Sequence, residues 1–221
     1  MPLEIEITEP KNTAQAAIIW LHGLGASADD FMGVVPMMHK VNPQVRFIFP
    51  NAPNQPVTIN HGVVMPSWYD INALDLNVQQ DEVGINNMML EIRELINQQI
   101  QQGILAKNIY LVGFSQGGAL ALHTALRAPM TLGGVAGLST YLPLHSKLQT
   151  EQAKENKQIE IFLAHGIFDP VVPMLLAERS KACLEACAYN VDWHIYPIAH
   201  MVTPQMIVDL EAWLLDQMKK C

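Results

Sequence analysis

The sequence contains 221 residues, of which 50% are hydrophobic and 15% are charged, so it can build the core of one α/β domain over residues 1–221. Its net charge of −8 and its lack of any Lys or Arg run argue against nucleic acid as a partner. No apolar run approaches the roughly 18 residues that cross a bilayer, so we expect no integral membrane contact. The N-terminal residues lack the basic and apolar regions of a secretory signal, which favours a cytoplasmic protein.

The three cysteines predict neither a disulfide framework nor a metal site. Cys183 and Cys187 lie four positions apart in a predicted helix, and Cys221 is the last residue. An odd number of cysteines makes a poor disulfide framework, and this spacing lacks the further Cys or His ligands of a zinc site. We therefore expect free thiols and no bound metal.

Three strands and two helices are predicted in the first half of the chain. The strands are expected at 3–8, which should lie at a sheet edge, at 16–21 and at 45–49. A helix should follow Asp29 and Asp30, which can cap it, and Pro36 should shorten or kink it. Apolar residues on one face predict a longer helix over 81–102, which Gly103 ends.

Strands and helices alternate through the second half of the chain. The expected strands are 108–112, 133–138, 158–164 and 191–196, and the expected helices are 118–126, 173–189 and a final helix that begins at Thr203 and Pro204. This alternation predicts the α/β class, with a mostly parallel central sheet and helices on both of its faces.

The segment Gly113-Phe-Ser-Gln-Gly117 lies between a predicted strand and a predicted helix. Glycines two positions either side of Ser115 permit a tight, strained turn that presents the serine hydroxyl at the end of the sheet. This pattern is the nucleophile elbow of α/β-hydrolases. The N–H of Gln116 would then lie at a helix N-terminus, where partial positive charge favours an oxyanion. The alternative is a glycine-rich turn that serves close packing alone.

A serine nucleophile needs a base, which an acid orients in turn. In α/β-hydrolases these residues follow the order nucleophile, acid, base. Asp169 follows the strand over 158–164, and His200 lies between the last strand and the last helix. Ser115, Asp169 and His200 are therefore the candidate catalytic residues. His165 comes from the strand end itself and is expected to be structural.

Two loops supply further candidates. The N–H of Leu24, in the loop His22-Gly-Leu-Gly25 after an early strand, is the candidate second oxyanion donor. Residues 50–77 are expected to form a long irregular loop, and loops of this length are usually functional. Its apolar residues, Met65 and Leu74 among them, predict a groove for an acyl chain. Simple packing of those residues is the alternative.

The motifs resemble those of the phospholipase/carboxylesterase family, which includes acyl-protein thioesterases and small lysophospholipase-like carboxylesterases. They are Leu21-His-Gly-Leu-Gly25, Phe49-Pro-Asn-Ala-Pro53, Pro66-Ser-Trp-Tyr-Asp70, Gly113-Phe-Ser-Gln-Gly-Gly118, Leu138-Ser-Thr-Tyr-Leu-Pro143 and His165-Gly-x-x-Asp-Pro-Val-Val-Pro173, followed by His200. The resemblance implies an α/β-hydrolase fold without a large cap domain and without a cofactor. It matches Ser115, Asp169 and His200 to the family triad, Leu24 and Gln116 to the oxyanion donors, and Trp68 to a tryptophan near the active site.

The expected function is that of a serine carboxylesterase, which hydrolyses acyl esters through an acyl-enzyme. Acyl-protein thioesterase and lysophospholipase activity stay open as alternatives, so the substrate is a small-molecule or lipid acyl ester or an acylated protein. A non-catalytic binding protein on the same fold is a further alternative. The resemblance also leaves a homodimer open, since dimers occur in the family. Met201, Ile167 and Phe168 depart from the family pattern, which leaves substrate preference open.

Overall fold

The computed structural model describes residues 2–73 and 79–220. A seven-stranded sheet in the order β1-β3-β2-β6-β7-β8-β9 forms its centre, and all neighbours are parallel except β1, which pairs with β3 antiparallel. The strands are β1 (Ile5–Thr8), β2 (Ala16–Leu21), β3 (Val45–Pro50), β6 (Ile109–Phe114), β7 (Gly134–Leu138), β8 (Ile161–Gly166) and β9 (Val191–Tyr196). The mostly parallel sheet and the edge position of the first strand confirm the predictions.

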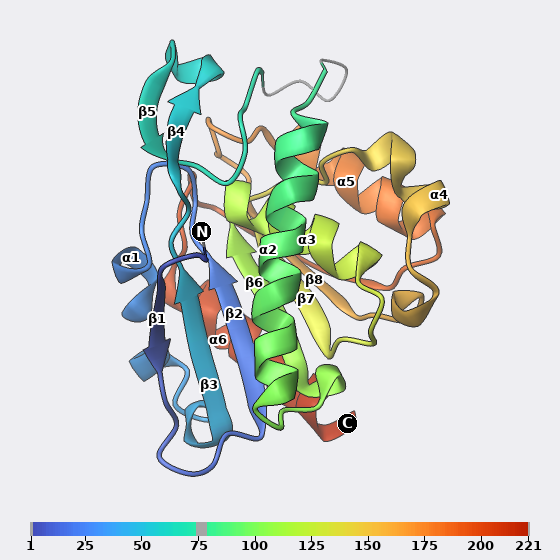
Figure 1. The fold of residues 1–221 in the computed structure, drawn as a ribbon. Coiled ribbons are helices and arrows are strands. Elements are labelled where there is room, and N and C mark those ends of the chain that lie inside the picture. Colours follow the sequence, from blue (N-terminus) through green and yellow to red (C-terminus); the bar gives the residue numbers. More distant parts are fainter. Residues whose placement is uncertain (1, 74–78, 221) are drawn as a thin grey trace.

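Helices cover both faces of this sheet (Figure 1). They are α1 (Asp29–Met32), α2 (Glu82–Gln101), α3 (Gln116–Arg127), α4 (Leu148–Glu151), α5 (Met174–Ala186) and α6 (Pro204–Lys220). Alternate side chains of β2 explain the two layers, because Ile19 and Leu21 pack with α2 and α3 whereas Ile18 and Trp20 pack with α1 and α6. The sheet is therefore buried on both sides, as its continuous apolar strands predict.

The segment over 50–77 is more regular than the sequence predicts. Its described part holds a hairpin of two antiparallel strands, β4 (Asn54–Val57) and β5 (Val63–Pro66). Pro56 and Pro66 lie within these strands, which a two-stranded ribbon tolerates because each strand has an unpaired edge. The hairpin projects beyond the carboxyl ends of the parallel strands in Figure 1. The expectation of an irregular loop is therefore wrong for this part of the segment.

The helix after Asp29 is also shorter than expected. It ends at Met32, and a 3₁₀ turn over Val35–Met37 contains Pro36. Neither aspartate caps the helix through its side chain; Ala28 occupies the cap position. Pro36 has therefore shortened the helix, as predicted, but the predicted capping is wrong.

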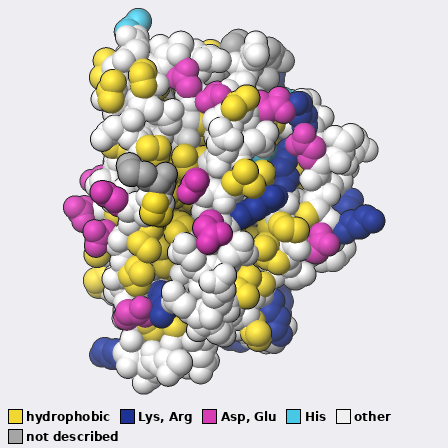
Figure 2. All heavy atoms as spheres, in the orientation of Figure 1, with side chains coloured by type: hydrophobic (Ala, Val, Ile, Leu, Met, Phe, Trp, Pro, Cys, Tyr) yellow, Lys and Arg dark blue, Asp and Glu magenta, His cyan; other side chains and the backbone are white. Residues whose placement is uncertain are grey.

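Acidic side chains are scattered over the face shown in Figure 2, and Lys and Arg lie mainly on its right flank and lower edge. Within residues 2–73 and 79–220, no helix combines the length and apolar character of a membrane span. Cys183 and Cys187 both carry free thiols. The candidate site residues lie at the edge of the sheet where β2, β6 and β8 end.

Candidate active site

The turn between β6 and α3 places Ser115 in a strained backbone conformation, with φ 53° and ψ −122°. The glycines on either side are required by backbone contacts. A Cβ atom on Gly113 would lie 2.4 Å from the carbonyl of Gly117, and one on Gly117 would lie 2.4 Å from the carbonyl oxygens of Leu21 and His22. The turn is thus held tightly against the end of β2, so the close-packing alternative applies to these glycines, and the strained conformation of Ser115 is the geometry that a nucleophile turn requires.

Ser115 lies at one end of a hydrogen-bonded chain of three side chains. His200 Nε2 is 2.9 Å from Ser115 Oγ, and His200 Nδ1 is 2.7 Å from Asp169 Oδ2. Asp169 is buried, and its other oxygen accepts hydrogen bonds from the N–H groups of Val171 and Val172 at 2.9 and 2.8 Å. The carboxylate is therefore fixed by backbone donors while it faces the imidazole. The three predicted residues come together from three different strand ends.

His165 contacts the loop that holds Asp169. Its side chain is buried, and its Nε2 lies 2.8 Å from the carbonyl oxygen of Val172. Burial lowers the pKa of His165, so the ring is neutral near pH 7 and its Nε2–H donates to that carbonyl. Because Val172 also donates to Asp169, His165 steadies the loop that carries the acid. This contact agrees with the structural role expected for His165.

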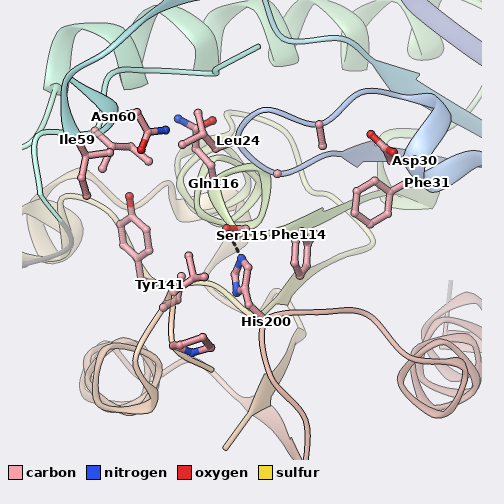
Figure 3. Close-up of a pocket in the computed structure, with 16 residues that line it drawn as sticks. Leu24, Asp30, Phe31, Ile59, Asn60, Phe114, Ser115, Gln116, Tyr141 and His200 are labelled. Carbon is pink, nitrogen blue, oxygen red and sulfur yellow. Dashed lines mark hydrogen bonds between the residues drawn. The ribbon is translucent and has the colours of Figure 1, made fainter. Parts of the chain in front are cut away.

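Two backbone N–H groups near Ser115 are without a partner in the described part of the chain. They belong to Leu24, in the loop after β2, and to Gln116, the first residue of α3. Both residues line the same cavity as Ser115 (Figure 3). The positive end of the α3 dipole adds to the field at Gln116. Free donors of this kind at a helix N-terminus suit a developing oxyanion.

The side chain of Gln116 has a separate role, which the sequence did not indicate. It is 1% exposed, and its Oε1 accepts a hydrogen bond from the Trp68 N–H at 3.0 Å. Its Nε2 donates to Ser67 Oγ at 2.9 Å and to the Tyr69 carbonyl at 2.7 Å. All the hydrogen-bonding groups of this buried amide are thereby used. We call these contacts the Gln116 clasp, which ties the segment after β5 to the turn that holds Ser115.

His22 and Trp68 support the loop that carries Leu24. The His22 ring accepts a hydrogen bond from the Ala52 N–H at 3.0 Å through Nε2, and its Nδ1 lies 2.7 Å from the Gly23 carbonyl. Burial lowers the pKa of His22, which keeps the ring neutral with its proton on Nδ1. Trp68 Nε1 donates to the His22 carbonyl at 2.8 Å. The loop is therefore held from two sides.

The cavity above Ser115 has a volume of about 610 Å³. On one side of Ser115 and His200 lies an apolar arm, formed by Ile59, Ile71 and Tyr141, in which the Ile59 N–H bonds the Ile71 carbonyl at 2.8 Å. On the other side lies what we call the aromatic arm, formed by Phe114, Phe31 and Asp30. Figure 3 shows the labelled residues of the two arms on opposite sides of the serine.

Two of the three predicted substrate-binding residues do not line this cavity. Trp68 is 1% exposed and lies behind the loop of Leu24, and Met65 contacts Asn60 through its sulfur. Leu74 lies outside the described residues. The lining residues Tyr141, Ile59 and Phe31 were missed, because they come from separate segments that no local pattern connects. The motif Leu138-Ser-Thr-Tyr-Leu-Pro143 was the one signal that could have pointed to Tyr141.

Fold and site together define a serine hydrolase of the α/β-hydrolase fold. A sequence model of the phospholipase/carboxylesterase family matches residues 3–216, and the chain belongs to this family. The chain is 41% identical to acyl-protein thioesterase 1 of Mycosarcoma maydis, over 90% of each chain. It is 37% identical to acyl-protein thioesterase 1 of Cryptococcus neoformans, over 95% of each chain. The crystal structure of Zea mays acyl-protein thioesterase 2 superposes with a TM-score of 0.88, at 27% identity over 97% of this chain and 98% of that one.

Proposed function

We propose that Ser115, His200 and Asp169 are the catalytic triad of this serine hydrolase, with Leu24 and Gln116 as its oxyanion donors. Ser115 Oγ attacks the acyl carbonyl carbon while His200 Nε2 takes the hydroxyl proton. Asp169 orients the imidazole and stabilises its charged form. The negative charge that develops on the carbonyl oxygen is met by the N–H groups of Leu24 and Gln116.

The same histidine then serves the second half of the reaction. It gives its proton to the departing alcohol or thiol, which leaves the acyl group on Ser115. A water molecule enters, His200 removes its proton, and the resulting attack releases the carboxylic acid and restores the serine. The observation that carries this proposal is the hydrogen-bonded chain from Ser115 Oγ through His200 to Asp169, which opens into an apolar cavity.

We infer that the substrates are esters and thioesters of acyl chains, with the chain in the apolar arm. The aliphatic side chains of Ile59 and Ile71 suit hydrocarbon, and the cavity volume suits a chain of moderate length. The names of the fungal relatives support an acylated protein thiol as one physiological substrate. The free thiols of Cys183 and Cys187 support action in the reducing cytoplasm.

Ser115→Ala tests the proposal. It should reduce turnover of p-nitrophenyl butyrate by about a thousandfold or more and abolish labelling by a fluorophosphonate probe, while the thermal unfolding midpoint stays close to that of the unchanged protein. Ser146→Ala is a matched serine control, because Ser146 is exposed and does not line the cavity, and it should keep both turnover and labelling. Undiminished hydrolysis by Ser115→Ala would refute the triad, and lack of labelling in the unchanged protein would favour the non-catalytic alternative.

A further inference from the structure

The aromatic arm differs chemically from the apolar arm. Its walls are the Phe114 and Phe31 rings, whose centroids are 5.7 Å apart, and a carboxylate, Asp30, lies at its outer end. A carboxylate beside aromatic rings is a poor environment for a hydrocarbon chain, but it suits a cation. The two arms therefore cannot accept the same part of a substrate equally well.

The position of His200 decides which part of the substrate enters the aromatic arm. His200 must hand its proton to the leaving oxygen, so the leaving group has to extend from the histidine side of Ser115. The Phe114 ring lies 4.7 Å from the His200 ring, and Phe31 follows beyond Phe114. The leaving group thus passes over Phe114 toward Phe31 and Asp30, while the acyl chain occupies the apolar arm.

The Asp30 carboxylate is held in place with one oxygen free. Its Oδ2 accepts hydrogen bonds from the N–H and the hydroxyl of Ser27, at 2.8 and 3.2 Å. Within the described residues, Asp30 forms no ion pair with Lys, Arg or His, and its Oδ1 has no hydrogen-bond donor. An anchored carboxylate with an unpaired oxygen next to two aromatic rings is the combination that binds substituted ammonium groups.

We propose that Asp30, Phe31 and Phe114 form a recognition site for a cationic leaving group, so that the enzyme prefers acyl esters of alcohols that carry an ammonium group. This inference rests on the proposed triad, because it assigns the leaving-group side of that site. Asp30 is solvent-exposed, so water and salt weaken its attraction for a cation. The expected preference is therefore about fivefold to tenfold in kcat/KM, rather than several orders of magnitude.

Two esters of one shape separate charge from size. Butyrylcholine and 3,3-dimethylbutyl butyrate differ in having a quaternary nitrogen or a carbon atom at the same position. The unchanged enzyme should favour butyrylcholine by about fivefold to tenfold in kcat/KM, and this ratio should fall toward one in Asp30→Asn. Asp29→Asn is the matched control, because Asp29 is the adjacent exposed carboxylate, does not line the cavity and gives the same change in net charge.

A measurement without any variant makes the test independent of how Asp30→Asn folds. Choline should inhibit hydrolysis of p-nitrophenyl butyrate competitively and several-fold more strongly than 3,3-dimethylbutan-1-ol, and added salt should reduce the difference. Equal hydrolysis of the two esters, equal inhibition by the two alcohols, or an unchanged ratio in well-folded Asp30→Asn would overturn the cation site. If the unchanged enzyme hydrolysed none of the three esters, butyrylcholine, 3,3-dimethylbutyl butyrate and p-nitrophenyl butyrate, the proposed triad would be overturned instead.

Discussion

The indole N–H of Trp68 donates a hydrogen bond of 2.8 Å to the carbonyl oxygen of His22, and the two rings lie 4.9 Å apart. This contact joins the segment after β5 to the loop that carries Leu24. Trp68 therefore lies behind the loop that carries the proposed oxyanion donor and does not line the cavity. We infer that the tryptophan of the family motif positions this loop.

Trp68→Phe should lower kcat by about tenfold with a smaller change in KM, because the loop of Leu24 loses one of its supports and the oxyanion donor is placed less well. The lost hydrogen bond should also cost about 1 kcal/mol of stability. Steady-state kinetics with p-nitrophenyl butyrate measures the first effect and urea unfolding the second.

Trp20→Phe is the control for this variant. Trp20 is equally buried, but its indole N–H has no partner in the described part of the chain, so the substitution removes ring volume without removing a hydrogen bond. It should reduce stability and leave kcat within about twofold. Equal kinetic losses in the two variants would show that the indole hydrogen bond has no specific effect.

Gly117→Ala should destabilise the protein by about 3 kcal/mol or more and remove most activity. The added Cβ would lie 2.4 Å from two backbone carbonyl oxygens at the end of β2, which are not free to move. Gly33→Ala is the matched control, because a Cβ at Gly33 meets nothing within 4 Å and its φ is −62°. It should change the free energy of unfolding by less than about 0.5 kcal/mol in urea. A Gly117→Ala protein with unchanged stability would contradict the close contact between β2 and the nucleophile turn.

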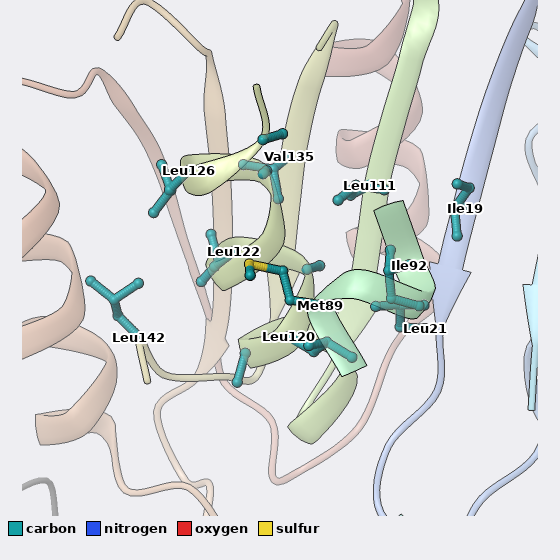
Figure 4. Packing of buried hydrophobic residues seen from close by; sticks show 14 of the residues in the cluster. Ile19, Leu21, Met89, Ile92, Leu111, Leu120, Leu122, Leu126, Val135 and Leu142 are labelled. Atoms are coloured by element: carbon teal, nitrogen blue, oxygen red, sulfur yellow. The ribbon is translucent and has the colours of Figure 1, made fainter. Parts of the chain in front are cut away.

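Acid should destabilise the protein through His123, a buried residue of α3 whose Nε2 lies 3.0 Å from Asn86 Oδ1 on α2. Its neighbour Leu122 on α3 belongs to the apolar cluster of Figure 4. Burial lowers the pKa of His123 to about 3, and the charges of Arg127 and Arg93 act in the same direction. The folded state thus favours the neutral ring. The contribution of His123 to the free energy of unfolding is complete above the pKa of about 6.5 that this histidine has in the unfolded chain. It is lost progressively as the pH falls toward 3.

The expected loss is about 2 kcal/mol between pH 7 and pH 5 from His123 alone. His123→Gln should make the decline shallower without abolishing it, because burial also lowers the pKa values of His22 and His165. Urea unfolding at several pH values measures the slope. An identical slope in His123→Gln would remove His123 as a cause.

Ile59→Trp should change the preference for acyl chain length. The larger side chain would fill part of the apolar arm, so kcat/KM should fall by about tenfold or more for p-nitrophenyl dodecanoate and much less for the acetate. Val64→Trp is the control on the same hairpin, because Val64 is 62% exposed and does not line the cavity. Parallel losses for short and long chains in Ile59→Trp would place the acyl chain elsewhere.

The sequence was sufficient for the parts of the molecule that follow local rules. The strand predicted over 108–112, observed over Ile109–Phe114, and the glycines around Ser115 predict the turn, and chain order then predicts Asp169 and His200 at later strand ends. The hairpin of β4 and β5 was missed because prolines usually indicate loops, whereas an isolated two-stranded ribbon accepts them on its outer edges.

The cavity could not be predicted because its walls come from segments that meet only in three dimensions. Phe31 follows β2, Ile59 belongs to the hairpin region, and Tyr141 follows β7. Each of these residues is an ordinary apolar position in its own segment. The position of Trp68 behind the loop of Leu24 likewise depends on its contact with His22, which is 46 positions away.

The Gln116 clasp has a consequence for the chemical ageing of the enzyme. The amide nitrogen donates to two oxygen atoms, those of Ser67 and Tyr69, so a carboxylate at this position would face both without a proton to offer. Deamidation of Gln116 to glutamate would therefore unfasten the segment after β5 while leaving every atom of Ser115, His200 and Asp169 intact. Such a protein would keep its nucleophile and lose the alignment that makes it effective.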